Sequence, residues 1–273
     1  MLVDHLKEDI FRYNSSMPRL LFKLSLFAIL VFTFFLVTLP SLTIYFIHQK
    51  TGRYILAKIV SLHSTICLKI FNIGLSVIGK SNIDKNGALL VSNHMSYVDI
   101  LCLASIYHTQ FVTSLEMKET PFLGHIAQAA GCVFVDRKSK NKREKELRDL
   151  VETLSSGGLV TIFPEATSTN GDDVLRFRHG LFESCFLAKR DVNPITINYK
   201  FINNKKVSNH NRDLICWYGD MTFFSHFFKL LSLKSIHIEI IFHEKLRHES
   251  FTNKSDLANR SHEVVKDNFL QLS

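Results

Sequence analysis

The feature that most constrains this chain is an uncharged run at residues 24–47, LSLFAILVFTFFLVTLPSLTIYFI. At a rise of about 1.5 Å per residue, a helix of these 24 residues covers the hydrocarbon core of a bilayer, which is about 30 Å thick. A secretory signal peptide has a shorter apolar stretch, of about 7–15 residues, and a small-residue cleavage site, which this run lacks. The run therefore predicts a membrane-associated helix.

Two arrangements of this helix compete. Pro40 removes a backbone donor late in the run and predicts a kink, so a bent or re-entrant hairpin is an alternative to a straight span. Basic residues stand on both sides of the run, with Arg19 and Lys23 before it and Lys50 and Arg53 after it. Because this symmetry gives no orientation by the positive-inside rule, a hairpin with both ends in the cytoplasm fits better than one span.

A second apolar stretch, residues 54–79, carries three groups that are costly at mid-bilayer and tolerated at its surface: Lys58, His63 and Lys69. We expect it to form an interfacial amphipathic helix, which makes residues 1–82 a membrane anchor. The stretch 222–233, TFFSHFFKLLSL, is either core or a further membrane-contacting helix. Phe and Leu with a basic edge favour membrane contact.

From residue 83 to 273 the pattern changes to short apolar runs that alternate with helical periodicity, which is typical of βα units. The predicted fold class is α/β, with a mainly parallel sheet flanked by helices behind the N-terminal membrane-associated segment. The expected strands are 88–92, 110–115, 132–135, 158–163, 194–199 and 236–242. The expected helices are 97–107, 122–130, 140–155 and 180–190.

The composition narrows the class of partner. Hydrophobic residues make up 46% of the chain, which excludes a disordered protein. An excess of 33 Lys and Arg over 25 Asp and Glu, hence +8, in a chain with 23 Phe favours an anionic membrane surface over nucleic acid. The five cysteines are scattered without metal-ligand spacing, which indicates a reducing compartment and no structural metal.

One polar stretch, SNHMSYVD at residues 92–99, follows a predicted strand, where open α/β sheets bind their ligands. Histidine titrates near neutral pH, so His94 is a candidate general base. Residues five apart do not share a helix face, so His94 and Asp99 meet only if His94 lies in the turn and Ser96 caps the helix. The same spacing recurs at His262 and Asp267 in a polar segment without a preceding strand, which we assign to a solvated helix.

Three further stretches end or begin strands. Arg137 closes GCVFVDR and is either a solvated strand-end charge or a bidentate phosphate ligand. Glu165 lies in FPEATSTNG, which puts a carboxylate and hydroxyls at the same sheet edge but is also compatible with a self-capping turn. VNPIT, at residues 192–196, reads as a buried strand entered through proline.

In order and spacing these four stretches resemble the motifs of the glycerolipid acyltransferase family, over roughly residues 70–245. The resemblance implies that His94 and Asp99 are catalytic, with His94 as the base that activates a lipid hydroxyl and Asp99 orienting it. It implies that Arg137 and Glu165 bind the acceptor, and extends acceptor binding to Asn93, Thr167 and Arg178. It requires no metal and no cofactor, because the acyl group comes from acyl-CoA or acyl carrier protein as co-substrate.

The implied function is transfer of a fatty acyl group to lysophosphatidic acid, making phosphatidic acid at a membrane with the active site facing the cytoplasm. Two departures bear on the acceptor, because Ala166 replaces the family's glycine and Ser168 stands where its arginine is expected. Arg176 or Arg178 is a possible substitute, and a lyso-lipid with another head group is the alternative acceptor.

Other classes of function are alternatives. An inactive lipid-binding protein of this fold and a basic nucleic-acid-binding protein remain rivals, although no nucleic-acid motif is present. A hydrolase lacks its Gly-x-Ser-x-Gly elbow. The segment 137–148 holds seven basic residues against two acidic ones, and is either a solvated helix face with a Glu144–Arg148 pair or a contact for anionic lipid or the acidic donor.

Overall fold

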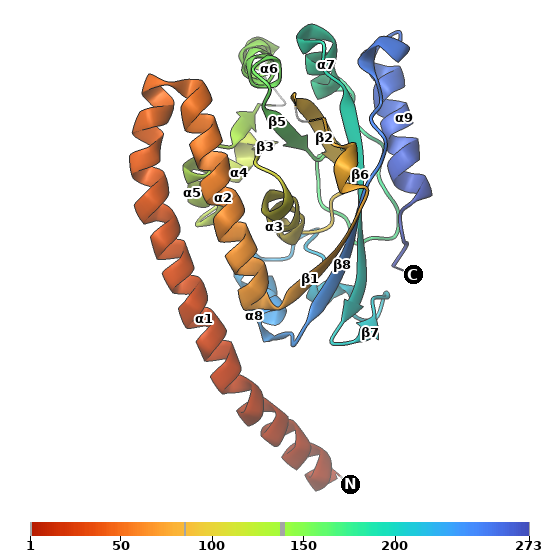
Figure 1. The fold of residues 1–273 in the computed structure, drawn as a ribbon. Coiled ribbons are helices and arrows are strands. Elements are labelled where there is room, and N and C mark those ends of the chain that lie inside the picture. The colour runs from red at the N-terminus through yellow and green to blue at the C-terminus, as the bar shows by residue number, and fades with distance from the viewer. Residues whose placement is uncertain (1, 85, 137–139, 273) are drawn as a thin grey trace.

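The computed structural model describes residues 2–84, 86–136 and 140–272, which fold into one αβα sandwich with a helical hairpin at its side (Figure 1). The strands are β1 Ile73–Ile78, β2 Ala88–Ser92, β3 Thr109–Ser114, β4 Val133–Val135, β5 Leu159–Ile162, β6 Val192–Ile202, β7 Lys205–Lys206 and β8 Ile236–Phe242. The α-helices are α1 Leu2–Ile47, α2 Gln49–Phe71, α3 Tyr97–Ile106, α4 Leu115–Lys118, α5 Leu123–Ala129, α6 Lys140–Ser155, α7 Glu183–Ala188, α8 Phe223–Ser232 and α9 Lys254–Asp267.

The strands form one sheet in the order β1-β8-β6-β2-β5-β3-β4, with β7 paired to β6. Neighbouring strands are parallel except where β6 meets β8 and β7. The predicted fold class is therefore confirmed, and all six expected strands are present. Since β2, β4 and β5 run in parallel, the segments that follow them emerge at one edge of the sheet.

The strand β2 shows how the sheet separates two cores, since all five of its residues are buried. Ala88 and Leu90 face the core beneath α2, α3 and α8, whereas Leu89 and Val91 face the core beneath α6, α7 and α9. A strand buried on both faces reads as a continuous apolar run, and the sequence ALLVS at 88–92 has that form.

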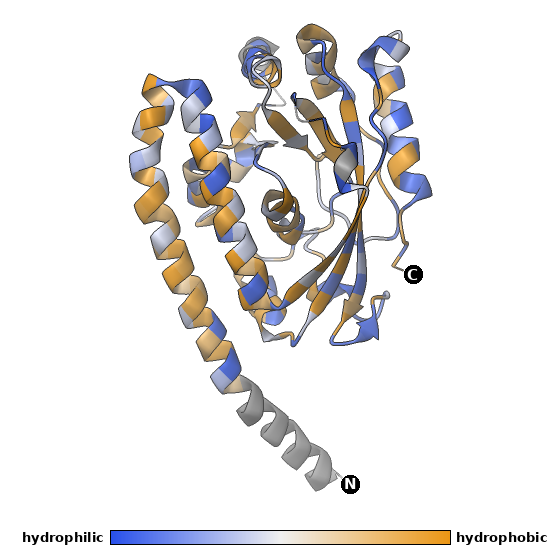
Figure 2. Cartoon of the chain, in the orientation of Figure 1, coloured by the Kyte–Doolittle hydropathy of each residue, from blue (hydrophilic) through white to orange (hydrophobic). Residues whose placement is uncertain are grey.

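The two N-terminal helices form an antiparallel hairpin, which turns at His48 rather than at Pro40 (Figure 1). Gly52 makes the close approach of α2 to α1 possible, because a Cβ atom there would lie 2.2 Å from the Cα atom of Tyr45. By length and composition, both Met17–Ile47 and Gln49–Phe71 are long and apolar enough to cross a membrane. Figure 2 shows the apolar character of α1 along most of its described length.

A buried lysine helps to attach this hairpin to the sandwich. The Nζ atom of Lys23 on α1 donates hydrogen bonds to the carbonyl oxygens of Leu233 at 2.8 Å, Leu231 at 3.3 Å and Phe71 at 3.5 Å. These carbonyls belong to the C-terminal ends of α8 and α2, where a helix carries partial negative charge. The hairpin is thereby held to the domain by charge as well as by apolar packing.

The helix predicted at residues 54–79 ends earlier than expected, at Phe71. The helix α2 stops at Phe71 because Asn72 adopts a left-handed conformation, with φ 57°, and its N–H donates to the carbonyls of Leu68 and Lys69. Residues 73–78 then pair in parallel with residues 236–241 as β1. The sheet thus begins before residue 83, where the sequence predicted the α/β domain to start.

Two amphipathic helices differ in detail from their expected forms. One face of α8 is core, with His226, Phe227 and Leu230 buried, while Phe224 and Phe228 remain exposed. The C-terminal helix was expected to be solvated, but one face of α9 is buried against the sheet: Leu257, Ala258, Ser261 and Val265.

The predicted Glu144–Arg148 pair on α6 is present, with 3.9 Å between its charged groups.

Candidate active site

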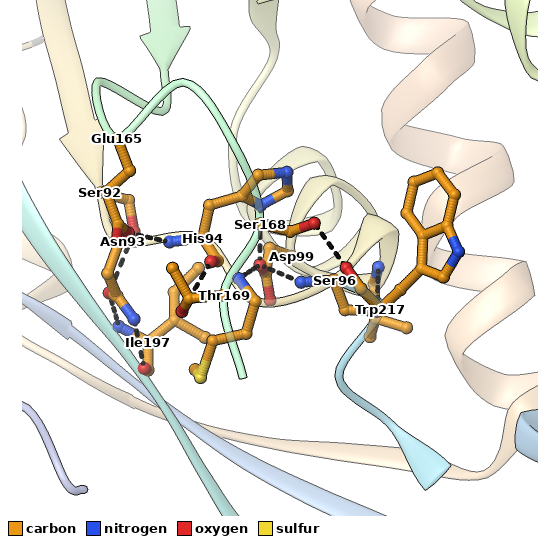
Figure 3. Close-up of polar contacts among 12 residues, drawn as sticks. Ser92, Asn93, His94, Ser96, Asp99, Glu165, Ser168, Thr169, Ile197 and Trp217 are labelled. Carbon is orange, nitrogen blue, oxygen red and sulfur yellow. Dashed lines mark hydrogen bonds and ion pairs between the residues drawn. The ribbon is translucent and has the colours of Figure 1, made fainter. Parts of the chain in front are cut away.

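The turn after β2 is held to the centre of the sheet by Asn93. This side chain is buried, donates from Nδ2 to the carbonyl of Ile197 at 3.0 Å and accepts from the N–H of Ile197 at 2.8 Å (Figure 3). Asn93 was expected to bind substrate, but its amide pairs with the backbone of β6. It therefore fixes where the following residue, His94, leaves the sheet.

The structure brings His94 and Asp99 together as the capping argument required. The Nδ1 atom of His94 lies 2.9 Å from Oδ2 of Asp99, and the His94 side chain is 18% exposed while that of Asp99 is fully buried. Ser96 caps α3 in a capping box with Asp99, which aims the carboxylate back at the turn. Because a carboxylate only accepts, Nδ1 carries the proton and Nε2 is left as the basic nitrogen.

The Asp99 carboxylate is surrounded by donors. Besides His94, its Oδ2 atom accepts from the backbone N–H groups of Met95 at 2.7 Å and Ser96 at 2.9 Å. Its Oδ1 atom accepts from the hydroxyl of Tyr199, on β6, at 2.7 Å. The N–H groups of Met95 and Ser96, in the loop after His94, are therefore directed to Asp99.

Glu165 and Phe163 join the loop after β5 to His94. The Oε1 atom of Glu165 accepts from the backbone N–H of His94 at 2.7 Å, and Oε2 accepts from the N–H of Leu175 at 2.7 Å. The ring of Phe163 stacks on the His94 imidazole, with 4.0 Å between centroids and 18° between planes. Glu165 is only 4% exposed, so it braces two loops rather than facing open solvent.

Burial also governs the charge of Glu165. Loss of hydration raises the pKa of its carboxyl from 4.5 to about 8, against the two backbone N–H groups that favour the charged form. The nearby Asp99 carboxylate adds to this rise. Glu165 is therefore the group beside His94 that exchanges a proton near neutral to mildly alkaline pH.

The rest of this loop is tied to the same turn. Thr169 donates its backbone N–H to the carbonyl of His94 at 2.9 Å, and the hydroxyl of Ser168 donates to the carbonyl of Trp217 (Figure 3). The backbone N–H of Trp217 in turn donates to the carbonyl of Met95 at 2.8 Å. Three chain segments are thus joined around His94.

Ala166 adopts the left-handed conformation, with φ 65°. A residue with a Cβ atom is strained there, whereas glycine is not. The alanine that stands in place of the family's glycine at this position therefore carries backbone strain.

The remaining expected acceptor ligands lie at the edge of this arrangement. Thr167 is exposed, and Arg178 is exposed with its backbone N–H bonded to the carbonyl of Pro164 at 2.9 Å. Arg176 and Arg178 line an open cleft of about 870 Å³, whose apolar wall includes Phe163. Arg137 lies outside the described residues. Among those that are described, no three His, Cys, Asp or Glu side chains converge as a metal site.

Tyr199 was not predicted from the sequence. It was expected only as part of a buried strand, and a period-two pattern through Ile195, Ile197 and Tyr199 is the signal that places its side chain on the α3 side of the sheet.

His262 and Asp267, which have the same spacing as His94 and Asp99, lie on a helix and do not form such a pair. His262 contacts the carbonyl of Val174 and the ring of Phe177.

Comparison with known proteins agrees with this geometry. A family model described as acyltransferase matches residues 74–198. The lyso-ornithine lipid O-acyltransferase of Rhodobacter capsulatus is 30% identical over 213 residues, which cover 76% of this chain and 74% of that protein. The 1-acyl-sn-glycerol-3-phosphate acyltransferase of Neisseria gonorrhoeae is 31% identical over 175 residues, which cover 64% of this chain and 66% of that protein.

The fold is shared with a solved structure, the crystal structure of the 1-acyl-sn-glycerophosphate acyltransferase of Thermotoga maritima. The two chains have 19% sequence identity and a TM-score of 0.64, with 94% of this chain and 95% of the other covered. The similarity therefore includes the helical hairpin as well as the sandwich. The structural similarity shows the fold, whereas the family match and the 30% identical relative show that this chain belongs to the glycerolipid acyltransferase family and is an acyltransferase.

Proposed function

We propose that this protein is a membrane-bound acyltransferase that moves a fatty acyl group from acyl-CoA or acyl carrier protein to the free hydroxyl of lysophosphatidic acid. The product is phosphatidic acid, a precursor in phospholipid biosynthesis. The name of the Neisseria gonorrhoeae relative supports a 1-acyl-sn-glycerol-3-phosphate acceptor.

The observation that carries the proposal is the His94–Asp99 contact of 2.9 Å at the edge where β2 ends. Asp99 is fully buried and faces Nδ1, so the partly exposed imidazole presents its basic Nε2 to substrate. In the described residues around His94, no serine or cysteine side chain forms a hydrogen bond with its imidazole. This geometry suits a base that activates the acceptor hydroxyl directly.

The chemistry follows from that placement. The Nε2 atom of His94 takes the proton of the acceptor hydroxyl as its oxygen attacks the carbonyl carbon of the thioester. The tetrahedral intermediate collapses, the C–S bond breaks, and the leaving thiolate recovers the proton from the imidazolium. The buried Asp99 carboxylate stabilises that imidazolium and holds its tautomer, so no acyl-enzyme is needed.

Acceptor binding is assigned to the basic groups at the open side of the site. Arg178 and Arg176 place two positive charges at the cleft beside Phe163, where an anionic head group is attracted. Arg137 is proposed as a further phosphate ligand, on the resemblance of its motif. Thr167 is exposed and available to the acceptor, whereas Asn93 and Glu165 support the site through backbone contacts.

A second candidate acceptor is a lyso-lipid whose head group is not a phosphate monoester. It is favoured by Ser168, which stands where the family has arginine and whose hydroxyl is bonded to the carbonyl of Trp217. A site without that guanidinium has less positive charge for a doubly anionic phosphate. The Rhodobacter capsulatus relative is named for a lyso-ornithine lipid acceptor, which fits this alternative.

The membrane supplies the acceptor in either case. The exposed apolar side chains of α1 and α2 are proposed to enter the bilayer as a hairpin, with both ends of the hairpin and the active site on the cytoplasmic side. The donor thioester then approaches from water, while the acceptor hydroxyl arrives from the lipid.

The test is an assay of purified full-length protein in vesicles with labelled acyl-CoA or acyl carrier protein and a panel of lyso-lipids. The panel contains lysophosphatidic acid, lysophosphatidylethanolamine, lysophosphatidylglycerol and lyso-ornithine lipid, and products are identified by mass spectrometry. Phosphatidic acid as the main product supports the first acceptor, and preference for another lyso-lipid supports the second. Binding of lipid with no acyl transfer to any acceptor would instead indicate an inactive lipid-binding protein.

A further inference from the structure

We propose that Tyr199 is a positioning residue for the reaction, because its hydroxyl holds the second oxygen of Asp99 and so sets the orientation and basicity of His94. The inference deepens the proposed function, since it concerns the same His94–Asp99 pair. Tyr199 lies outside the four sequence motifs, on the far part of β6. Its side chain is fully buried, so it acts on His94 through Asp99.

The contact is short and completely buried. The Tyr199 hydroxyl lies 2.7 Å from Oδ1 of Asp99, and both side chains are inaccessible to solvent. Among the hydrogen bonds of the described residues, Tyr199 is the one donor to Oδ1, whereas Oδ2 accepts from His94, Met95 and Ser96. Without Tyr199, a buried carboxylate oxygen loses its donor, which is costly for a charged group.

The strand β6 explains why this hydroxyl is well placed. Ile197, two residues earlier, is bonded on both its N–H and its carbonyl to the side chain of Asn93, which directly precedes His94. The pairing of β6 with β8 is regular up to Tyr199 and shifts between Tyr199 and Phe201. The same rigid strand therefore fixes both the start of the His94 turn and the carboxylate of Asp99.

The electrostatic effect has a definite sign. Each hydrogen bond to a carboxylate withdraws negative charge and lowers its affinity for a proton. The Tyr199 hydroxyl therefore weakens the pull of Asp99 on the imidazolium of His94, while fixing the direction of that pull. Burial raises the pKa of Tyr199 well above its ordinary value, so the hydroxyl remains a donor throughout the working pH range.

Other titratable groups also lie near Asp99, and two of them are buried thiols. Burial raises the pKa of Cys102, on α3, and of Cys216, in the loop before α8, so both thiols stay protonated at neutral pH. A further described neighbour, Glu165, has a pKa of about 8 and so titrates at neutral to mildly alkaline pH. The comparison between variants is therefore made below pH 7.5.

The experiment follows the titration of His94 directly in the full chain in detergent, by NMR of ¹⁵N-labelled histidine, with the His94→Gln spectrum assigning the signal. In Tyr199→Phe we expect the titration midpoint to rise by about half to one pH unit, because Asp99 holds the imidazolium more strongly. We expect kcat to fall roughly ten- to hundred-fold, with KM little changed. The acid limb of the pH profile should move with the NMR midpoint.

A second variant covers the case in which Tyr199→Phe does not fold. Site-specific replacement of Tyr199 by a ring-fluorinated tyrosine keeps its shape and makes the hydroxyl a stronger donor, so the His94 midpoint should move to lower pH. The control is Tyr218→Phe, which removes a 2.7 Å tyrosine–carboxylate hydrogen bond to Asp213 elsewhere in the chain. It should leave both the midpoint and kcat unchanged.

Opposite shifts in the two Tyr199 variants support the proposal. The proposal is overturned if Tyr199→Phe folds and the His94 midpoint does not move. If Tyr199→Phe does not fold, an unmoved midpoint in the fluorinated protein overturns it. Because the titration needs no turnover, a wild-type protein that transfers no acyl group contradicts the proposed function separately and leaves the titration result to decide the role of Tyr199.

Discussion

The carboxylate of Glu165 accepts a hydrogen bond from the backbone N–H of His94 at 2.7 Å, although the two residues lie 71 positions apart in the sequence. Its other oxygen binds the N–H of Leu175. One buried side chain thus positions the base-bearing turn against the loop that follows β5. The resemblance implied that Glu165 binds the acceptor, whereas these contacts favour a bracing role within the site.

Replacement of Glu165 distinguishes the two roles. In Glu165→Ala the N–H groups of His94 and Leu175 lose their buried acceptor, at a cost of about 1–3 kcal/mol each, and the turn that carries the imidazole is released. We expect kcat to fall at least about 100-fold with a small change in KM for the acceptor. Steady-state kinetics over a range of acceptor concentrations measure both values. A large rise in KM with unchanged kcat would restore the acceptor-binding role.

The raised pKa of Glu165 predicts how stability depends on pH. Between pH 4.5 and about 8 the folded state holds a proton that the unfolded state has lost, so stability falls as pH rises through this window. The slope is at most about 1.4 kcal/mol per pH unit for one proton. Chemical unfolding from pH 6.5 to 8 avoids the range of His226, whose pKa burial lowers to about 4. In Glu165→Gln this part of the slope should be absent, and an equal slope in both proteins would contradict the assignment.

Removal of the proposed base has an internal control. His94→Ala should lose several orders of magnitude in kcat while still binding vesicles, and Asp99→Asn should lose about 10³–10⁴-fold because the imidazole tautomer is no longer held. His262→Ala removes a histidine with the same spacing to an aspartate, but one that contacts Val174 and Phe177. It should keep wild-type turnover. Near-normal turnover by purified His94→Ala would refute the assignment of the base.

The strained loop predicts a stabilising substitution. Ala166 has φ 65°, and a left-handed conformation costs a residue with a Cβ atom about 1–2 kcal/mol. Glycine avoids this cost, but its larger conformational entropy in the unfolded state offsets part of the gain in stability. We expect Ala166→Gly to raise the free energy of unfolding by about 0.5–1 kcal/mol. The matched change Ala104→Gly, inside α3, should lower it by about 1 kcal/mol or more. Denaturant titration of both variants compares these signs.

Local sequence signals predicted most of the sheet and part of the site. The strands at 88–92 and 236–242 were expected at the bounds observed, because strong apolar runs are bordered by polar or turn-forming residues. The contact between His94 and Asp99 followed from a capping argument within one turn of helix. Both depend on neighbours in the sequence, where spacing is informative.

Features that depend on distant partners were missed. Residues 73–78 were assigned to a helix because the local sequence does not show that they pair with residues 236–241. The helix before them ends at a single left-handed residue, Asn72. Tyr199 reaches Asp99 across 100 positions. Asn93 was expected at the substrate, but the partner of its amide, Ile197, lies 104 positions away. Each of these contacts depends on the order of strands in the sheet.

The outward face of α1 predicts where the protein meets lipid. Phe22, Phe32 and Phe46 are 64%, 67% and 79% exposed, and their spacing puts them within roughly a third of the helix circumference. Moving a phenylalanine from water into lipid stabilises binding by about 1.5–3 kcal/mol, so replacing all three with serine should weaken vesicle binding by at least about 100-fold. Phe201→Ser, at a 43% exposed position on β6, should bind vesicles like the wild type. Co-sedimentation with anionic vesicles measures this. If the triple variant sediments as the wild type does, the bilayer contact lies on another face of the protein.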